Sequence, residues 1–196
     1  MRGCLEEGTP AFVEFNPSPK HKLDYTWHSV LLNNTMVGIN THLPNKIVDQ
    51  ALRQKLLLPF KDYAIIEPEK TIAPAVRIDF CLRSPNEICF LEVKNVHYAE
   101  KGIALFPDCP TTRGVKHLKT LIECANQGTR AALVYVIQRD DCHGFNFCDR
   151  FDPEYASVAR QALKAGVEMY AFSVQLTSSY IALKGLLPFE NDETQK

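Results

Sequence analysis

Two acidic residues and a lysine lie on two segments of this sequence that otherwise favour buried strands. Asp79 falls in the run Arg-Ile-Asp-Phe at 77–80, and Glu92 and Lys94 belong to the largely apolar segment 88–95. Side chains two residues apart on a strand point to one face of the sheet, so Glu92 and Lys94 share a face. Hairpin pairing of the two strands would bring the carboxylate of Asp79 beside that of Glu92.

Carboxylates that are buried together repel each other and lose hydration, so they need protons, cationic partners or a metal. Their oxygens suit Mg²⁺ or Mn²⁺, which keep several waters and leave room for a phosphate oxygen. Lys94 beside them would orient or activate the attacking water and stabilise charge on the phosphoryl group. An Asp followed by Glu-x-Lys on the next strand is the layout of PD-(D/E)XK nucleases. The alternative is a structural ion pair between Lys94 and either acid, because Glu-x-Lys strings are common.

A basic segment follows these strands. Between residues 101 and 130 there are five Lys and Arg residues and two acidic residues, a local charge of +3. Arg113, Lys116 and Lys119 recur every three residues, which places them on one flank of a predicted helix. The N-terminus of this helix could hold a phosphate through its backbone N–H groups. The segment is therefore predicted to bind the DNA backbone, and the alternative is an ordinary solvated helix face.

Two residues of the same region each have more than one interpretation. His117 is grouped with the DNA-binding residues; the alternatives are a surface residue, a packing residue or a catalytic group. Asp108 is predicted to be a further metal ligand, with a loop or helix-capping role as the alternative.

Cations and aromatic residues are interleaved near the N-terminus. Lys20, His21 and Lys22 precede Tyr25 and Trp27. This arrangement suits backbone contacts combined with base stacking, as on the surfaces of OB folds. Lys20, Lys22 and Trp27 are therefore predicted to contact DNA, although Trp27 could equally be a core residue.

The elements that must position these residues follow from hydrophobic periodicity and turn residues. Asn45 is predicted to cap a helix that Pro59 stops, with a domain boundary near Pro44. Residues 83–87 supply a turn, so the strands on either side of it are expected to pair antiparallel. The other predicted strands are 10–15, 25–32, 36–40, 63–67, 75–82, 88–95, 131–138 and 167–176, and the other predicted helices are 111–126 and 153–164.

This order predicts a mixed sheet with helices on its faces. Three N-terminal strands bury too little surface to form an independent unit. They are expected either to lean on the rest of the protein or to belong to a small barrel with strands missing upstream.

Composition excludes several classes of protein. The chain has 196 residues, of which 45% are hydrophobic and 23% charged, which excludes disordered and fibrous proteins. No apolar run is long enough for a membrane span and the N-terminus lacks a signal peptide, so a cytoplasmic protein is expected. The net charge of −1 means that DNA binding must come from a local patch.

Missing motifs narrow the function further. Seven cysteines without a Cys-x-x-Cys pair indicate reduced thiols rather than a zinc ribbon or a disulfide framework. The sequence has no P-loop, nucleophile elbow, His-Glu-x-x-His or dinucleotide-binding motif, and no haem or nucleotide cofactor is expected.

A series of short motifs supports a family resemblance over nearly the whole chain. They are Tyr-Thr-Trp at 25–27, Ile-Asn-Thr at 39–41, Arg-Ile-Asp-Phe at 77–80, Glu-Val-Lys-Asn-Val at 92–96, Phe-Pro-Asp at 106–108, Arg-Gly-x-Lys-His-Leu at 113–118 and Asp-Pro-Glu-Tyr-Ala at 152–156. Together they resemble the sugar fermentation stimulation protein A family. The resemblance implies a DNA-binding protein with an N-terminal OB-like barrel and a C-terminal nuclease-like domain.

The chain departs from the family pattern in two places. Family members usually start some tens of residues earlier, so the barrel is expected to be incomplete through truncation or a late start. Val76 stands where the family usually has a small polar residue. The resemblance also leaves open whether Glu67 or Glu69 occupies the family's acidic position.

The sequence therefore predicts an α/β (α+β) protein with a partial OB-like β domain at 1–44, a PD-(D/E)XK nuclease-like domain at 45–189 and an acidic tail at 190–196. The predicted function is DNA binding with Mg²⁺- or Mn²⁺-dependent phosphodiester hydrolysis. Asp79, Glu92 and Lys94 are the predicted catalytic residues, and Asp79, Glu92 and Asp108 the predicted metal ligands. One alternative is a non-catalytic DNA-binding regulator of sugar metabolism whose acid–lysine cluster is structural. Another is an inactive remnant with an incomplete barrel.

Overall fold

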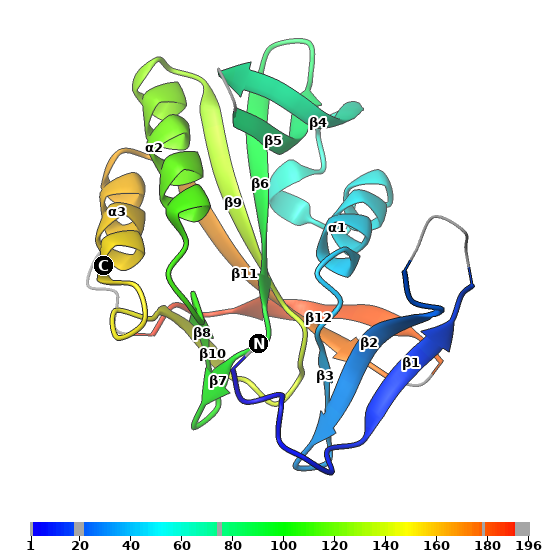
Figure 1. Ribbon diagram of the computed structural model, residues 1–196. Coiled ribbons are helices and arrows are strands. Elements are labelled where there is room, and N and C mark those ends of the chain that lie inside the picture. Colours follow the sequence, from blue (N-terminus) through cyan, green and yellow to red (C-terminus); the bar gives the residue numbers. More distant parts are fainter. Residues whose placement is uncertain (1, 18–21, 74–75, 178, 191–196) are drawn as a thin grey trace.

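The main sheet of the protein has six strands, in the order β12-β11-β9-β6-β5-β4 (Figure 1). The computed structural model describes residues 2–17, 22–73, 76–177 and 179–190. Along the chain the elements are β1 Ala11–Phe15, β2 Tyr25–Leu32, β3 Thr35–Gly38, α1 Leu43–Arg53, the 3₁₀ turn η1 Leu58–Phe60, β4 Ile65–Ala73, β5 Val76–Arg83, β6 Ile88–Val96, β7 Ala99–Glu100, β8 Ile103–Phe106, α2 Thr112–Asn126, β9 Arg130–Ile137, β10 Gly144–Phe147, α3 Pro153–Lys164, β11 Glu168–Leu176 and β12 Ile181–Leu187.

The sheet is mixed, as the sequence predicts, and helices cover both of its faces. Strands β6, β9 and β11 run parallel, whereas β4, β5 and β12 are antiparallel to their neighbours. Alternate side chains of β9 point to opposite faces. Leu133 and Tyr135 share a core with Leu118 of α2, while Val134 shares a second core with Val48 of α1. Helices α2 and α3 therefore lie on one face, and α1 on the other (Figure 1).

The starts of α2 and α3 are held by one carboxylate. Asp152 caps α3, its Oδ1 accepting a hydrogen bond from the backbone N–H of Tyr155 at 2.9 Å. Its Oδ2 accepts from the backbone N–H of Thr111, the N-cap residue of α2, at 2.8 Å. Capping satisfies N–H groups that have no partner inside the helix. The contact also fixes the first turn of α2 relative to α3.

Several predicted elements are confirmed. The strand at 25–32 and the helix at 153–164 have the predicted bounds, and the helix at 111–126 begins one residue later than predicted. Strands β5 and β6 pair antiparallel, from Arg83 opposite Ile88 to Phe80 opposite Leu91. All seven cysteines are described, and each is a free thiol.

The prediction that Asn45 caps a helix is wrong. Helix α1 begins at Leu43 after the N-cap residue His42, and Asn45 lies in its first turn. Pro44 is accommodated there because the first N–H groups of a helix have no partner within it. The side chain of Asn45 is thereby free to contact β5.

Four strands were not predicted, namely β7, β8, β10 and β12. Strands β7, β8 and β10 form a small separate sheet, and β12 lies at the edge of the main sheet. The predicted strand at 63–67 also extends further, to Ala73 in β4. These segments are short or lie at an edge, where hydrophobic alternation is weak.

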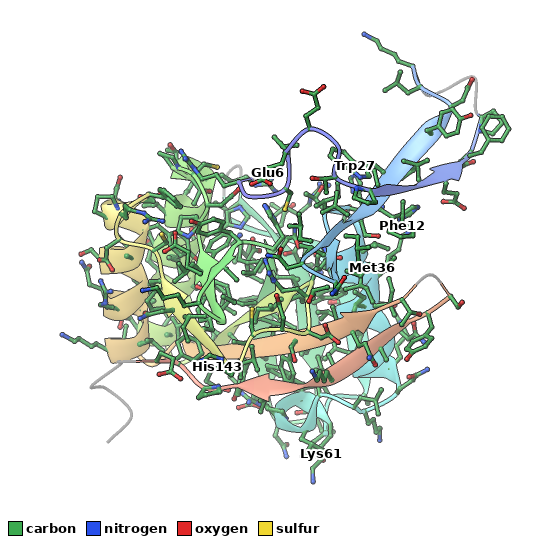
Figure 2. The ribbon with its side chains drawn as sticks, turned by 90° about the horizontal axis from the view of Figure 1, so that it is seen from below. Glu6, Phe12, Trp27, Met36, Lys61 and His143 are labelled. Carbon is green, nitrogen blue, oxygen red and sulfur yellow. The ribbon has the colours of Figure 1, made fainter. Side chains whose placement is uncertain are left out.

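The N-terminal strands form a third sheet, in the order β1-β2-β3, and no barrel is detected among the described residues. This sheet contacts the end of β9. The backbone N–H of Gly38 donates to the carbonyl oxygen of Gln138 at 2.7 Å, and the amide of Gln138 donates to the carbonyl oxygen of Asn40 at 3.2 Å. A Cβ at position 38 would lie 2.9 Å from Cβ of Gln138, which the backbone holds in place, so this approach favours glycine. In Figure 2, Phe12, Trp27 and Met36 mark the sheet, whose outer end projects beyond the main body.

The division into two domains stays a prediction, and its boundary at Pro44 falls within the first turn of α1. Lys20 and most of the predicted acidic tail lie outside the described residues. Within the described part of the chain, no helix is both long and apolar enough to cross a membrane.

Candidate active site

Glu92 and Lys94 lie on the face of β6 that α2 covers. Glu92 is only 2% exposed, and Lys94 is half-buried. The ammonium group of Lys94 contacts Oε1 of Glu92 at 2.5 Å, and Nδ1 of His117 on α2 contacts the same oxygen. Because a carboxylate oxygen without a proton can only accept hydrogen bonds, both nitrogens donate to it. Glu92 and Lys94 therefore share a face of the sheet, as predicted, and His117 joins them in a cluster of three residues.

The second oxygen of Glu92 differs from the first in its surroundings. Oε2 is buried and has no hydrogen-bond partner among the described residues. Burial alone would raise the pKa of Glu92, but the hydrogen bond from His117 and the charge of Lys94 outweigh it and lower that pKa below its usual range. Glu92 is therefore ionised at neutral pH. A buried, charged oxygen without a partner is costly unless a cation meets it, and carboxylate oxygens are the ligands that Mg²⁺ and Mn²⁺ prefer.

Asp79 occupies the point where β5 and β6 stop pairing. The ladder runs from Arg83 opposite Ile88 to Phe80 opposite Leu91, so its last pair lies next to Asp79. Instead of continuing the ladder, Oδ2 of Asp79 accepts a hydrogen bond from the backbone N–H of Val93 at 2.8 Å, and Oδ1 accepts one from the amide of Asn45 at 2.8 Å. Burial raises the pKa of Asp79, and the negative charge of Glu92 raises it further.

The two carboxylates are supported from opposite faces of the sheet. Asn45, which holds Asp79, comes from α1, whereas His117, which holds Glu92, comes from α2. The link between them is the backbone of β6, because Asp79 bonds to the residue that follows Glu92. Their joint role as metal ligands stays a prediction. No group of three or more His, Cys, Asp and Glu side chains suited to a metal ion exists in the parts of the chain that the structure describes.

A cleft of about 430 Å³ opens beside this cluster, between α2 and the β4–β5 hairpin. It is lined by Thr71, Val76, Arg77, Thr112, Arg113, Lys116 and His117. Three of these residues are basic. Nε of Arg113 donates to Nε2 of His117 at 3.4 Å, so the ring of His117 lies between the cleft and Glu92. The arrangement can receive an anionic group next to a buried carboxylate.

The predicted basic flank of α2 divides into two parts. Arg113 and Lys116 line the cleft, whereas Lys119, one turn further on, is exposed and lies 3.4 Å from Glu154 of α3. His117, predicted with the DNA-binding residues, is 3% exposed and both of its ring nitrogens have partners. The structure thus places His117 inside the fold, in contact with Glu92.

A second cleft, of about 510 Å³, lies on the α1 side of Asp79. Of the two glutamates that the resemblance leaves open, Glu69 lines this cleft together with Asp79. Glu69 has a positive φ of 57° and lies 3.2 Å from Arg77. Glu67 instead hydrogen-bonds to Arg83 at 2.9 Å. Sequence reasoning missed Asn45 as a partner of Asp79, because a polar residue near a proline is typical of a helix cap.

Asp108, the third predicted metal ligand, has different neighbours from Asp79 and Glu92. Its Oδ2 lies 3.4 Å from Nε2 of His97 and accepts a hydrogen bond from the backbone N–H of Arg2 at 3.3 Å. The neighbouring imidazole of His97 lowers the pKa of Asp108 well below its usual range. Among the described residues no group of three or more His, Cys, Asp and Glu side chains suited to a metal ion is found, and the predicted set of Asp79, Glu92 and Asp108 stays a prediction.

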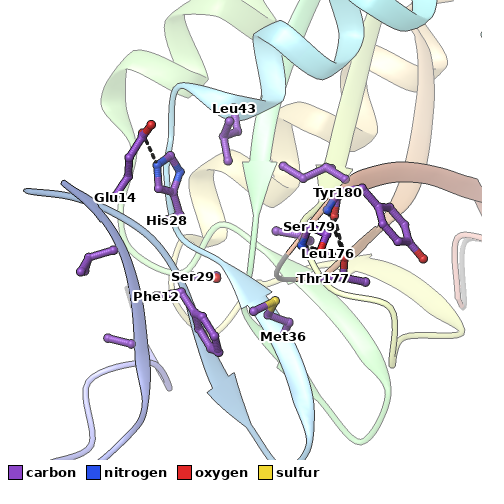
Figure 3. A pocket seen from close by; sticks show the side chains of 13 residues that line it. Phe12, Glu14, His28, Ser29, Met36, Leu43, Leu176, Thr177, Ser179 and Tyr180 are labelled. Carbon is purple, nitrogen blue, oxygen red and sulfur yellow. Dashed lines mark hydrogen bonds and ion pairs between the residues drawn. The ribbon is translucent and has the colours of Figure 1, made fainter. Parts of the chain in front are cut away.

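Of the predicted N-terminal DNA contacts that the structure describes, Trp27 lies on β2 of the N-terminal sheet, and Lys22 lies in the segment that precedes β2. Lys22 is exposed, while Trp27 is half-buried, packs against the core of this sheet and donates from Nε1 to the carbonyl oxygen of Ser29 at 3.1 Å. A third cleft, of about 620 Å³, separates this sheet from the β11–β12 hairpin (Figure 3). Phe12 and Tyr180 lie on its opposite sides, and Trp27 does not line it.

Comparisons with known proteins agree on one family. Residues 42–180 match the family described as "Sugar fermentation stimulation protein RE domain". Two proteins described as sugar fermentation stimulation protein homologs, from Geotalea daltonii and Bartonella tribocorum, are 42% and 41% identical to this chain. The alignments cover 96% and 97% of this chain, and 81% and 79% of those relatives. The solved structure of Pyrococcus furiosus SfsA in complex with Ca²⁺ is 28% identical, with a TM-score of 0.85 over 92% of this chain and 77% of that one.

Proposed function

This chain belongs to the sugar fermentation stimulation protein family and carries its restriction endonuclease-like (RE) domain, and from this premise we propose that it binds DNA and hydrolyses phosphodiester bonds with Mg²⁺ or Mn²⁺. The observation that carries the proposal is Oε2 of Glu92, which is buried, charged and without a donor among the described residues. Such an oxygen suits a divalent cation.

Glu92 would hold the cation through Oε2, and Asp79 would supply the second carboxylate. Water and phosphate oxygens would complete the coordination, as is usual for Mg²⁺. The related protein from Pyrococcus furiosus was solved with Ca²⁺, which also prefers oxygen ligands. When bound, the cation would polarise a phosphoryl oxygen and acidify a bound water.

Positively charged side chains of this chain would bind and orient the DNA substrate. Lys94, held against Glu92, would orient the attacking water or neutralise the charge that develops on the phosphoryl group. Arg77, Arg113 and Lys116 would hold the DNA backbone in the cleft beside α2. Lys22 and Trp27, together with Lys20, would extend this contact along the N-terminal sheet, which we interpret as part of an OB-like domain.

Cleavage assays test this function. Purified protein is incubated with single- and double-stranded DNA and Mg²⁺ or Mn²⁺, beside Lys94→Ala and the matched control Lys119→Ala. We expect cleavage that a chelator abolishes, that Lys94→Ala reduces by about two to three orders of magnitude, and that Lys119→Ala leaves unchanged. Equal activity of wild type and Lys94→Ala, or no activity in either with any metal, would reject hydrolysis.

A second candidate function is a non-catalytic, DNA-binding regulator of sugar metabolism. One observation favours it: Lys94 already pairs with Glu92, and both oxygens of Asp79 already have donors. This regulator would bind DNA with a steep dependence on salt and would be insensitive to metal and to Asp79→Asn.

A further inference from the structure

We propose that His117 is a positioning residue that holds Glu92 by Oε1 and thereby directs Oε2 toward the cation. The inference rests on the proposed metal centre and deepens it, because it assigns a buried helix residue to the orientation of a strand carboxylate. The sequence places His117 among the predicted DNA-binding residues, with a surface, packing or catalytic role as alternatives. The structure instead makes it a partner of Glu92.

The two ring nitrogens of His117 have different partners. Nδ1 faces Oε1 of Glu92, and Nε2 faces Nε of Arg113 at 3.4 Å. The carboxylate accepts and the guanidinium donates. A neutral ring with its proton on Nδ1 satisfies both partners at once. This tautomer gives Oε1 a fixed donor and leaves Oε2 free.

Lys94 alone does not fix the carboxylate of Glu92. It lies two residues away on the same strand, and its ammonium group sits at the end of a flexible stem with rotatable donors. The ring of His117 comes from another element, 25 residues away, and is almost fully buried. Donors from two elements define the plane of a carboxylate better than one mobile donor. Such outer partners orient the groups that bind metals.

Helix α2 holds the ring of His117 in a defined place. The side chain of Thr111 accepts a hydrogen bond from the backbone N–H of Gly114 at 3.1 Å, and Thr111 is itself held by Asp152. A Cβ at Gly114 would lie 2.8 Å from the side chain of Thr111 and 3.0 Å from that of Tyr155, so the first turn packs tightly against α3. His117 follows this fixed turn, so its position is set by the fold.

Binding of Mn²⁺ to the whole protein, measured by calorimetry and electron paramagnetic resonance, tests the proposal without any turnover. His117→Leu removes the donor at similar volume, whereas His117→Asn keeps an N–H near the position of Nδ1. Thr120→Val is the matched control, a buried residue of α2 whose hydroxyl bonds to the carbonyl oxygen of Lys116. We expect His117→Leu to weaken Mn²⁺ binding by about 10- to 100-fold. His117→Asn and Thr120→Val should remain within about threefold of wild type, because the donor to Oε1 is kept.

Unchanged Mn²⁺ affinity in His117→Leu would overturn the positioning role while leaving the metal centre in place. Equal weakening in His117→Asn and His117→Leu would overturn the role of the hydrogen bond. Absence of Mn²⁺ binding in wild type would overturn both this inference and the metal centre. If His117→Leu does not fold, ¹⁵N NMR of the wild-type imidazole decides the question. A proton on Nδ1 and a bare Nε2 support the proposal, and the opposite tautomer contradicts it.

Discussion

Glu92 and Glu168 both lie on strands of the main sheet, and both have a lowered pKa. They differ in how many hydrogen-bond donors each carboxylate oxygen has. For Glu168, burial would raise the pKa, but hydrogen bonds from Arg130 and Tyr170 lower it. Nε of Arg130 donates a hydrogen bond to Oε1 at 2.7 Å. Oε2 accepts hydrogen bonds from Nη2 of Arg130 at 2.9 Å and from the hydroxyl of Tyr170 at 2.6 Å. Glu92 has two donors on Oε1, and the described residues offer none to Oε2.

The difference separates a structural ion pair from a candidate site. Arg130 also donates to the carbonyl oxygen of Pro59 at 3.0 Å and to the hydroxyl of Tyr63 at 3.1 Å, so its network joins β9 and β11 to the segment around η1. Each oxygen of Glu168 is satisfied, and the network stabilises the fold. Glu92 is more deeply buried and keeps one oxygen unsatisfied, which lowers stability unless a ligand meets it. Such unsatisfied groups are found where proteins bind or react.

The largest expected effect comes from a substitution at Glu92. Glu92→Gln removes the charge but keeps the shape, so it should reduce phosphodiester cleavage by at least about 100-fold. It should also lower the free energy of unfolding at pH 7, because the pKa of Glu92 is lowered in the fold and the change leaves the ammonium group of Lys94 without its charged partner. Cleavage assays and urea unfolding measure the two effects. A variant that cleaves like wild type would remove Glu92 from the site.

The second prediction makes the matching change at Glu168. Glu168→Gln leaves Arg130 partly unpaired, so the free energy of unfolding should fall by about 2 kcal/mol at pH 7. The rate of cleavage should stay unchanged. The pKa of Glu168 is lower in the folded state than its ordinary value of 4.5. The stabilisation is therefore present above about pH 4.5 and is lost as the pH falls through the folded-state pKa. Urea unfolding from pH 7 to pH 3 measures this, and a difference between variant and wild type that does not shrink on acidification would contradict the assignment.

The third prediction compares two lysines of one helix. Lys116 lines the cleft beside Glu92, whereas Lys119 lies beside Glu154. Lys116→Ala should weaken DNA binding several-fold and reduce the slope of log affinity against log salt by about 1. Lys119→Ala should change neither quantity. Fluorescence anisotropy at several salt concentrations measures both quantities. Equal effects of the two substitutions would contradict the prediction that the DNA phosphates bind in the cleft.

The smallest expected effect concerns the stability cost of the site. The pKa of Asp79 is raised above its ordinary value of 3.8 by burial and by Glu92. A raised pKa means that the ionised carboxylate destabilises the fold as the pH rises through the folded-state value. Asp79→Asn should therefore stabilise the protein at pH 7, and by less near pH 3.8, once the amide of Asn45 has turned its oxygen toward the new NH₂ group. Thermal unfolding at both pH values checks the sign, and a destabilised variant at pH 7 would show that the charge of Asp79 supports the fold.

Much of the fold was accessible from the sequence. Long periodic segments such as β2 and α3 were predicted with the bounds that the structure has, and the motifs identified the family that the comparisons establish. The short strands β7, β8 and β10 and the edge strand β12 were missed. They carry too few residues, or too weak an alternation, to stand out from loops.

The candidate site was predicted only in part. The shared face of Glu92 and Lys94 follows from strand geometry and is present. The partners supplied by helices were not foreseen, since contacts over long sequence separations leave no local pattern. His117 had one usable signal: it lies four residues before Leu121, one helical turn away, and Leu121 is among the buried residues of α2.

The central claim is that Oε2 of Glu92 is a cation ligand. Anomalous diffraction from crystals of this protein soaked in Mn²⁺ tests it most directly. We predict a peak about 2.2 Å from Oε2 of Glu92, with Asp79 as the neighbouring carboxylate. A peak confined to other acidic residues, or no peak at Glu92 at saturating Mn²⁺, would contradict the claim.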